Sequence, residues 1–147
     1  ASLPLISPGI FRDFVVPCNK KIISAIGGKY NTPPPAVIMG GDTSRLIDFF
    51  IDAGTSLVAA DFNTDFSFIR RRLAESGCSL VVRGCLDPKM IERGDWAGLD
   101  AAIEKLAGKA RGMTNFVWGC GCVSYDTSRQ NLLTFKEKCL AASAATV

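Results

Sequence analysis

The chain has 147 residues, of which 48% are hydrophobic and 21% charged, enough apolar material for one domain with a hydrophobic core. This composition excludes intrinsic disorder, and no run approaches the ~20 uncharged apolar residues that a membrane-spanning helix needs. Seventeen Lys and Arg against fourteen Asp and Glu leave a net charge of +3, too small for the concentrated basic surface of a nucleic-acid-binding protein. We therefore expect a cytoplasmic globular protein whose partners are neither nucleic acid nor membrane.

The residue types available for chemistry are restricted, because the chain contains no histidine. This excludes Ser-His-Asp and Cys-His catalytic machinery carried by this chain alone, and any zinc site with histidine ligands. Persistent disulfides are rare in cytosolic proteins, so metal binding, catalysis and burial are the roles left for the cysteines. The six cysteines are Cys18, Cys78, Cys85, Cys120, Cys122 and Cys139.

The chain opens with a predicted helix that starts at Ser7-Pro8, is kinked or restarted at Pro17 and ends at Gly27-Gly28. A loop with three consecutive prolines follows. Short apolar runs without polar alternation are then predicted as buried strands, at residues 36–39, 57–60, 80–82 and 116–118. Each strand precedes amphipathic helical segments with capping residues, at residues 42–53, 65–76, 88–93 with 95–109, and 126–139. The Ala-rich tail after residue 139 is expected to fray.

This alternation of strands and helices predicts an α/β fold, a parallel sheet covered by helices. It fits a small doubly wound sheet or part of a (βα)8 TIM barrel. A whole barrel needs about 250 residues, so four units would form half of one. Four strands also leave two open sheet edges, and we expect a half-barrel to pair with its missing half or with itself. The first residue, Ala1, fits a piece cut from a longer protein.

Metal-binding side chains follow three consecutive predicted strands. Asp61, Cys85 and Cys120 each stand where a strand ends, with Cys122 as an alternative to Cys120. Barrel active sites lie at these carboxyl ends, and neighbouring strands are ~4.8 Å apart, so the three side chains can converge. Zinc accepts such oxygen and sulfur ligands and keeps a fourth position open when it is catalytic. The spacing therefore predicts a zinc site, with burial as small hydrophobes as the alternative.

Three further residues are candidates for substrate binding. Arg83 lies just before a strand end, where it would pair with a substrate carboxylate or form an ordinary salt bridge. Asp42 follows Gly40-Gly41 and is either part of an anion-binding turn or an N-cap. Tyr125 lies in a strand-to-helix loop and is a candidate for lining a pocket. No residue is assigned as a catalytic acid or base.

Five segments, in chain order, resemble motifs of the uroporphyrinogen decarboxylase superfamily, which also contains zinc-dependent methyltransferases that act with corrinoid proteins. The segments are SPGIFRDFVVP at 7–17, IMGGDT at 38–43, DAG at 52–54 with Asp61, GCLDP at 84–88 with Gly94, and GCG at 119–121 with Thr127 and Asn131. The resemblance extends from Ser7 to about Cys139. It implies a single (βα)8 barrel, of which residues 1–147 are one domain fragment, the C-terminal half.

The resemblance also separates two branches of the family. Decarboxylases need no cofactor and usually have a histidine where Cys120 stands, whereas the methyltransferases have a cysteine zinc ligand there. Their usual His-x-Cys pair is absent, because Ile38 and Gly40 occupy those places. Asp61 and Cys85 look like the acidic residue and cysteine that replace this pair in some corrinoid-linked members.

The resemblance therefore implies an enzyme that uses one zinc ion to move a methyl group between a corrinoid protein and a thiol or folate. Two alternatives remain open at this stage. One is a metal-free carboxy-lyase that decarboxylates a tetrapyrrole. The other is a half-barrel that has no catalytic activity by itself.

Overall fold

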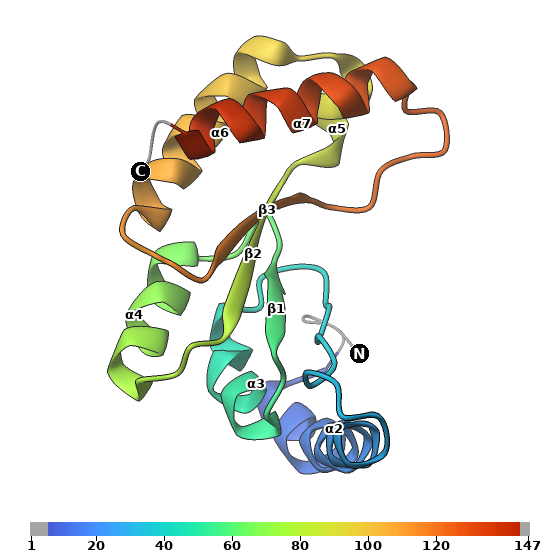
Figure 1. The fold of residues 1–147 in the computed structure, drawn as a ribbon, viewed down its shortest axis with the longest axis vertical. Helices are drawn as coiled ribbons and strands as arrows, with labels where there is room; N and C mark the ends of the chain where they lie inside the picture. The colour runs from blue at the N-terminus through green and yellow to red at the C-terminus, as the bar shows by residue number, and fades with distance from the viewer. Residues whose placement is uncertain (1–5, 145–147) are drawn as a thin grey trace.

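The computed structural model describes residues 6–144, which form helices packed on a parallel sheet (Figure 1). The strands lie in the order β1-β2-β3, and each pair of neighbours is parallel. Their bounds are Leu57–Ala60 for β1, Val81–Leu86 for β2 and Phe116–Cys120 for β3. This confirms the predicted α/β class with parallel βα units. No helix within residues 6–144 is long and apolar enough to cross a bilayer.

Residues 36–39, predicted as the first strand, do not form a strand in the structure. Only Val37 pairs with the sheet there, through an isolated parallel bridge to Val58. The Val37 amide donates to the carbonyl of Leu57 at 3.0 Å, but Ile38 is 67% exposed. The three prolines at 33–35 have no N–H to extend the ladder, so the segment stays a single bridge at the β1 edge.

The N-terminal helix runs further than predicted. It comprises α1 (Pro8–Ile10), a π-helical segment η1 (Phe11–Val15) and α2 (Val16–Tyr30). The wider π turn lies just before Pro17. The irregularity predicted at Pro17 is therefore found one turn earlier, and the helix continues through the proline. The predicted end at Gly27-Gly28 is wrong, since the helix ends at Asn31 in the left-handed conformation. Helix-interior glycines cost only about 1 kcal/mol each, which does not by itself end a helix.

The remaining helices begin within three residues of their predicted starts, and only the last one departs by more than one residue at both ends, from 126–139 to 129–144. They are η2 (Ser44–Leu46), α3 (Ile47–Ala53), α4 (Phe66–Ser76), α5 (Pro88–Arg93), α6 (Trp96–Ala110) and α7 (Arg129–Ala144). The expected fraying after Cys139 is wrong for the described residues, because α7 continues to Ala144. There Trp118 Nε1 donates a hydrogen bond to Ser143 Oγ at 2.8 Å, which ties the end of α7 to β3.

All the helices of Figure 1 lie to one side of the sheet or beyond its ends, and the other face has no helix over it. Two clusters of buried side chains fill the covered face. One joins the N-terminal helix, α3 and α4 to the sheet through Phe11, Leu46, Phe50, Val58, Ile69 and Val82. The other joins α5, α6 and α7 to the strand ends through Leu86, Ile91, Leu99, Ile103 and Cys139.

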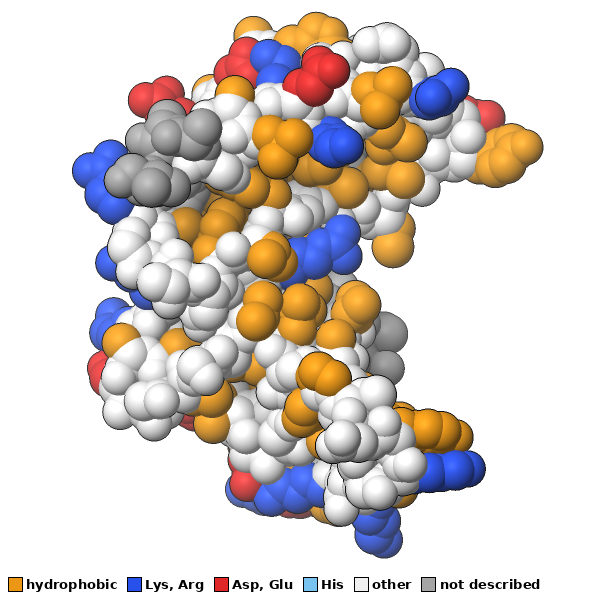
Figure 2. Space-filling view, in the orientation of Figure 1, with side chains coloured by type: hydrophobic (Ala, Val, Ile, Leu, Met, Phe, Trp, Pro, Cys, Tyr) orange, Lys and Arg blue, Asp and Glu red, His pale blue; other side chains and the backbone are white. Residues whose placement is uncertain are grey.

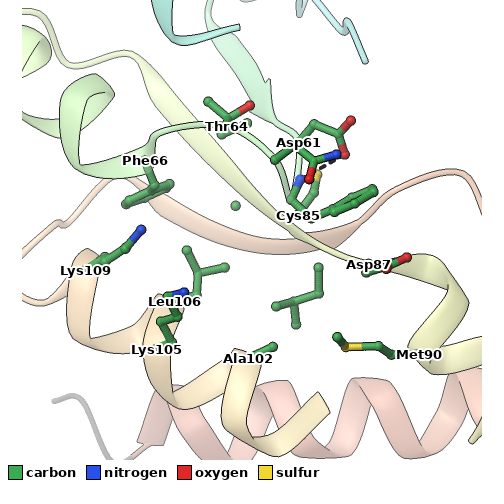
Figure 3. A pocket seen from close by; sticks show the side chains of 15 residues that line it. Asp61, Thr64, Phe66, Cys85, Asp87, Met90, Ala102, Lys105, Leu106 and Lys109 are labelled. Carbon is green, nitrogen blue, oxygen red and sulfur yellow. Dashed lines mark hydrogen bonds between the residues drawn. The ribbon is translucent and has the colours of Figure 1, made fainter. Parts of the chain in front are cut away.

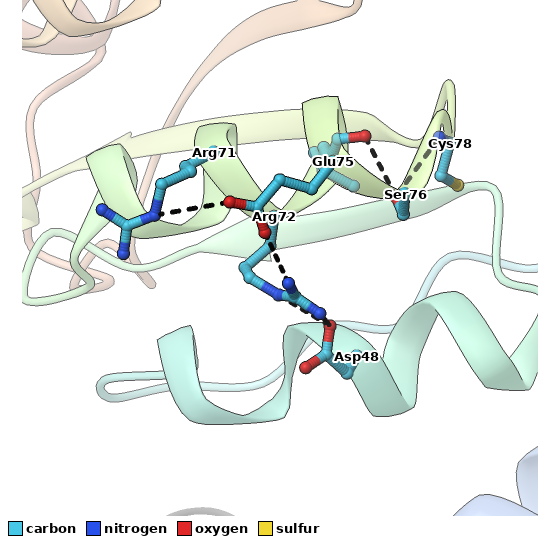
Figure 4. A network of polar contacts seen from close by, with 7 residues as sticks. Asp48, Arg71, Arg72, Glu75, Ser76 and Cys78 are labelled. Carbon is cyan, nitrogen blue, oxygen red and sulfur yellow. Dashed lines mark hydrogen bonds and ion pairs between the residues drawn. The ribbon is translucent and has the colours of Figure 1, made fainter.

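Polar contacts on the outer surface link α3 to α4 (Figure 4). Arg72 donates to Asp48 Oδ1 from Nε at 3.1 Å and from Nη2 at 2.9 Å, and it also pairs with Glu75. These side chains are well exposed, and exposed ion pairs contribute about 0–1 kcal/mol at most. The packing of the two helices therefore rests mainly on the buried cluster beneath them.

Candidate active site

The uncovered face of the sheet carries the chemically active side chains. The strands pair Ala59 with Arg83, Arg83 with Val117, and Cys85 with Gly119, so these residues point to one face. Figure 2 shows that the molecule is hollowed on this side, and that hydrophobic side chains gather in the hollow with a basic side chain among them. The strands' carboxyl ends open into this hollow.

A cavity of about 600 Å³ lies at these strand ends. The structure places all the predicted metal donors around it, namely Asp61, Cys85, Cys120 and Cys122. Arg83 lines the same cavity. The rest of the wall is apolar or backbone, and includes Ile38, Met39, Phe62, Pro88 and Val123. The cavity therefore combines one basic group, one acidic group and three thiols with apolar walls.

Asp61 and Cys85 are held firmly at the cavity. The Asp61 carboxylate accepts hydrogen bonds from the amides of Gly41 at 2.7 Å and Phe62 at 2.9 Å, which fix its orientation. Cys85 is 8% exposed, and its thiol donates to the Arg83 carbonyl. Burial raises the pKa of Cys85 to about 11; Arg83 opposes the rise, and negative charge on Asp61 adds to it. The metal-free thiol is therefore protonated at neutral pH.

Cys120 is placed differently from the other two donors. It pairs with Leu86 in the strand register, which turns it toward the helix-covered face, and it packs against the cluster that contains Cys139. Burial raises its pKa as well. Within residues 6–144, no group of three or more Cys, Asp or Glu side chains is placed so that it could hold a metal ion. The donor types suit zinc, but they surround the cavity without forming a ready ligand set.

Two of the predicted substrate-binding residues lie outside this cavity. Asp42 accepts hydrogen bonds from the amide and hydroxyl of Ser44 at 3.0 and 2.6 Å in an Asx turn just before η2, whose N-cap is Thr43, so the predicted N-cap role of Asp42 is wrong. Burial acts to raise the pKa of Asp42, but the hydrogen bonds from Ser44 and the Asp65 amide, with the positive charge of Arg45, together lower it. Tyr125 is fully exposed and is not among the residues that line the cavity. Of the three candidates, the structure brings only Arg83 together with the thiols.

A second cavity, of about 340 Å³, lies between α6 and the ends of β1 and β2 (Figure 3). Lys105 and Lys109 of α6 line it on one side, and Asp61 and Cys85 lie at its far edge. Phe66, Met90, Ala102 and Leu106 form its apolar walls. These lysines do not stand out in the sequence, because lysines on an amphipathic helix resemble an ordinary solvated face. Of the predicted metal donors, this cavity contains only Asp61 and Cys85, so it is not the place where all of them meet.

The buried thiols predict how the stability of the metal-free chain depends on pH. Burial raises the pKa of Cys85 and of Cys139 from 9.0 to about 11. Between these values the folded chain keeps protons that the unfolded chain loses, so the free energy of unfolding falls as the pH rises from 9 to 11 and is unaffected below 9. The urea midpoint, measured with a chelator present, tests this.

The double variant Cys85→Ala/Cys139→Ala is the matched test of this dependence, and it is expected to flatten the fall in the urea midpoint. The exposed Cys18, changed to Ala, serves as the control and should leave the slope as it is. An equally steep fall in the double variant would assign the pH dependence to other groups.

Comparison with known proteins agrees with the geometry. The family model described as uroporphyrinogen decarboxylase matches residues 1–139. A curated relative, the uroporphyrinogen decarboxylase of Streptomyces coelicolor, is 26% identical over 129 residues, which cover 88% of this chain and 34% of the relative. The chain thus spans about a third of the length of that relative. Its parallel α/β fold is consistent with part of a TIM barrel. The chain belongs to the uroporphyrinogen decarboxylase family.

Proposed function

We propose that the protein containing this chain is a zinc-dependent methyltransferase, which moves a methyl group between a corrinoid protein and a thiol or folate. The observation that carries the proposal is one cavity lined by a carboxylate and thiols from three consecutive strand ends. The sequence resemblance adds a second argument, since Cys120 stands where decarboxylases of the family usually have histidine.

Asp61, Cys85 and Cys120 would hold the zinc ion, which acts as a Lewis acid toward the methyl acceptor when it is bound. The Asp61 carboxylate is already oriented by two backbone amides, and it would supply an oxygen ligand. Cys85 must lose its proton to become a ligand, and the nearby positive charge of Arg83 favours the thiolate. Cys120 lines the cavity at the end of β3 but also packs against the cluster that contains Cys139, so its thiol would have to turn away from that cluster to bind zinc; Cys122 is the alternative ligand.

We further propose that the other strands of the barrel cover the hollow face and supply the remaining contacts to donor and acceptor. The chain's match to 34% of a relative supports this. In the isolated chain, the same face would pair with a second copy. Tests of activity and metal content therefore belong to the intact protein.

Zinc analysis of the intact protein tests the proposal. We expect about one zinc ion per chain in the wild type and close to none in Cys85→Ser, because serine does not replace a thiolate ligand at neutral pH. Cys18→Ser is the matched control, since Cys18 is exposed and is not among the residues lining the cavity, and it should keep the wild-type zinc content. Elemental analysis before and after chelation gives the count.

The zinc contents of Cys120→Ser and Cys122→Ser decide which of the two cysteines is the third ligand, because only loss of the true ligand lowers the zinc content. Full zinc content in Cys85→Ser would contradict the ligand set. A zinc-free wild type would contradict the methyltransferase itself.

A second candidate is decarboxylation of a tetrapyrrole without a metal. Arg83 favours it, because it places a positive charge in the cavity where a substrate carboxylate can bind. The curated relative carries the name uroporphyrinogen decarboxylase. Turnover of uroporphyrinogen by the chelated intact protein, at the rate of the untreated sample, would establish this alternative.

A further inference from the structure

Arg83 is a basic side chain without an acidic partner in the part of the chain that the structure describes. No ion pair joins it to an aspartate or glutamate there, so the ordinary salt bridge considered from the sequence does not form among these residues. Its Nη2 donates one long hydrogen bond, 3.4 Å, to the carbonyl of Cys120. Most of the guanidinium donors therefore remain available to a ligand.

Gly119 gives the Arg83 side chain its place on the sheet. A Cβ added at Gly119 would lie 2.7 Å from Arg83 Cγ and 3.0 Å from Cδ, and would also overlap Nε. The stem of Arg83 therefore lies flat across the backbone of Gly119. Because Gly119 pairs with Cys85 in the register, two residues beyond Arg83, the side chain leans toward the carboxyl end of the sheet. That is where the cavity opens.

The cavity carries two opposite charges, of which the positive one on Arg83 is left to bind a ligand with a single negative charge. Its lining contains one cation, Arg83, and one carboxylate, Asp61, whose two oxygens already accept backbone hydrogen bonds. A guanidinium matches a carboxylate through two parallel N–H···O bonds. A phosphate dianion would call for further positive charge, and the described lining offers none. Phe62 and the other apolar residues around it suit a hydrophobic ligand body.

We propose that Arg83, seated on Gly119, binds the carboxylate of a small substrate with an apolar body in this cavity. The inference rests on the proposed function only in placing the active site at these strand ends. It does not depend on zinc.

Carboxylate binding to the chelated intact protein tests the inference. The probes are 3-phenylpropionate, its neutral amide 3-phenylpropionamide and inorganic phosphate, followed by ligand-observed NMR. We expect the carboxylate to bind at least about tenfold more tightly than the amide, since charge-assisted hydrogen bonds are the stronger ones. Arg83→Gln should abolish this preference, and Gly119→Ala should weaken it by displacing the side chain. Arg71→Gln, on the exposed face of α4, is the matched control and should change nothing.

Three outcomes would overturn the inference: equal affinity for carboxylate and amide, a preference that survives in Arg83→Gln, or phosphate binding as tightly as the carboxylate. Arg83→Lys guards against a variant that does not fold, because it retains the charge without the planar fork and should keep part of the preference. Zinc is counted in the untreated samples. If the untreated protein contains no zinc but the chelated protein prefers the carboxylate, only the methyltransferase proposal is contradicted. If the protein contains zinc but shows no such preference, only the role of Arg83 is contradicted.

Discussion

Replacing Phe50 by alanine is expected to lower the free energy of unfolding by about 3–5 kcal/mol, as truncation of a buried phenylalanine usually does. Phe50 is 0% exposed, and its ring meets that of Phe11 edge to face at 5.8 Å. Since Phe50 belongs to α3 and Phe11 to the N-terminal helix, the pair joins that helix to the rest of the domain. Urea unfolding followed by circular dichroism measures the change.

Phe14→Ala is the matched control for this prediction. Phe14 lies one helical turn from Phe11 but is 70% exposed, so its truncation should change the free energy of unfolding by no more than about 0.5 kcal/mol. Equal losses in the two variants would mean that the N-terminal helix does not pack on α3 in solution. A small loss in Phe50→Ala alone would mean that this core is already loose.

Local signals were sufficient to predict most helices. Asp65 and Asp95 accept hydrogen bonds from amides three residues further on, and Gly77 and Gly94 end helices in the left-handed conformation. Each of these signals acts within a few residues, so it can be read from the sequence without knowledge of the fold. The bounds of α4, α5 and α6 agree with the prediction for this reason.

The errors arise where distant parts of the chain decide the structure. Residues 36–39 have the composition of a strand, but a strand needs a ladder, and only Val37 reaches one. Gly27 and Gly28 lie in a helix that packs along α3, where Lys20 of the same helix pairs with Asp52 at 2.7 Å. Neither the missing ladder nor this tertiary contact is visible in the local sequence.

In the candidate site, too, one part could be predicted from the sequence and another depended on the fold. The order of strand ends was enough to predict that Asp61, Cys85 and Cys120 would lie near one another, because parallel strands bring their carboxyl ends together, and the three line one cavity. That they hold one zinc ion stays a prediction. The face on which Cys120 lies depends on where β3 ends. The predicted strand stops at residue 118, whereas β3 continues to Cys120, so strand alternation turns Cys120 to the same side as Trp118. A shift of two residues at a strand end thus decides which face of the sheet Cys120 lies on.

Gly84→Ala is expected to lower the free energy of unfolding by about 1–3 kcal/mol, which is typical of overpacking. A Cβ at Gly84 would lie 2.5 Å from Phe116 Cε2 and 3.0 Å from Leu106 Cδ2. Both neighbours are themselves confined: Phe116 stacks edge to face with Trp118 at 4.9 Å, and Leu106 packs against both buried clusters. Neither can give way without disturbing the packing of α6 on the sheet.

A Gly→Ala substitution in α6 is the matched control, and it should change the free energy of unfolding in the opposite direction. Gly108 has no atom within 4 Å of an added Cβ and lies on an exposed helix surface, so Gly108→Ala should raise the free energy of unfolding by about 0.5–1 kcal/mol through helix propensity. Urea midpoints of the two variants would therefore move in opposite directions from the wild type. If both moved upward, the gap between β2 and α6 would be wider than the structure gives.

Because Phe116 begins the strand that carries Gly119, a strained Gly84→Ala chain should also lose part of its preference for carboxylate over amide.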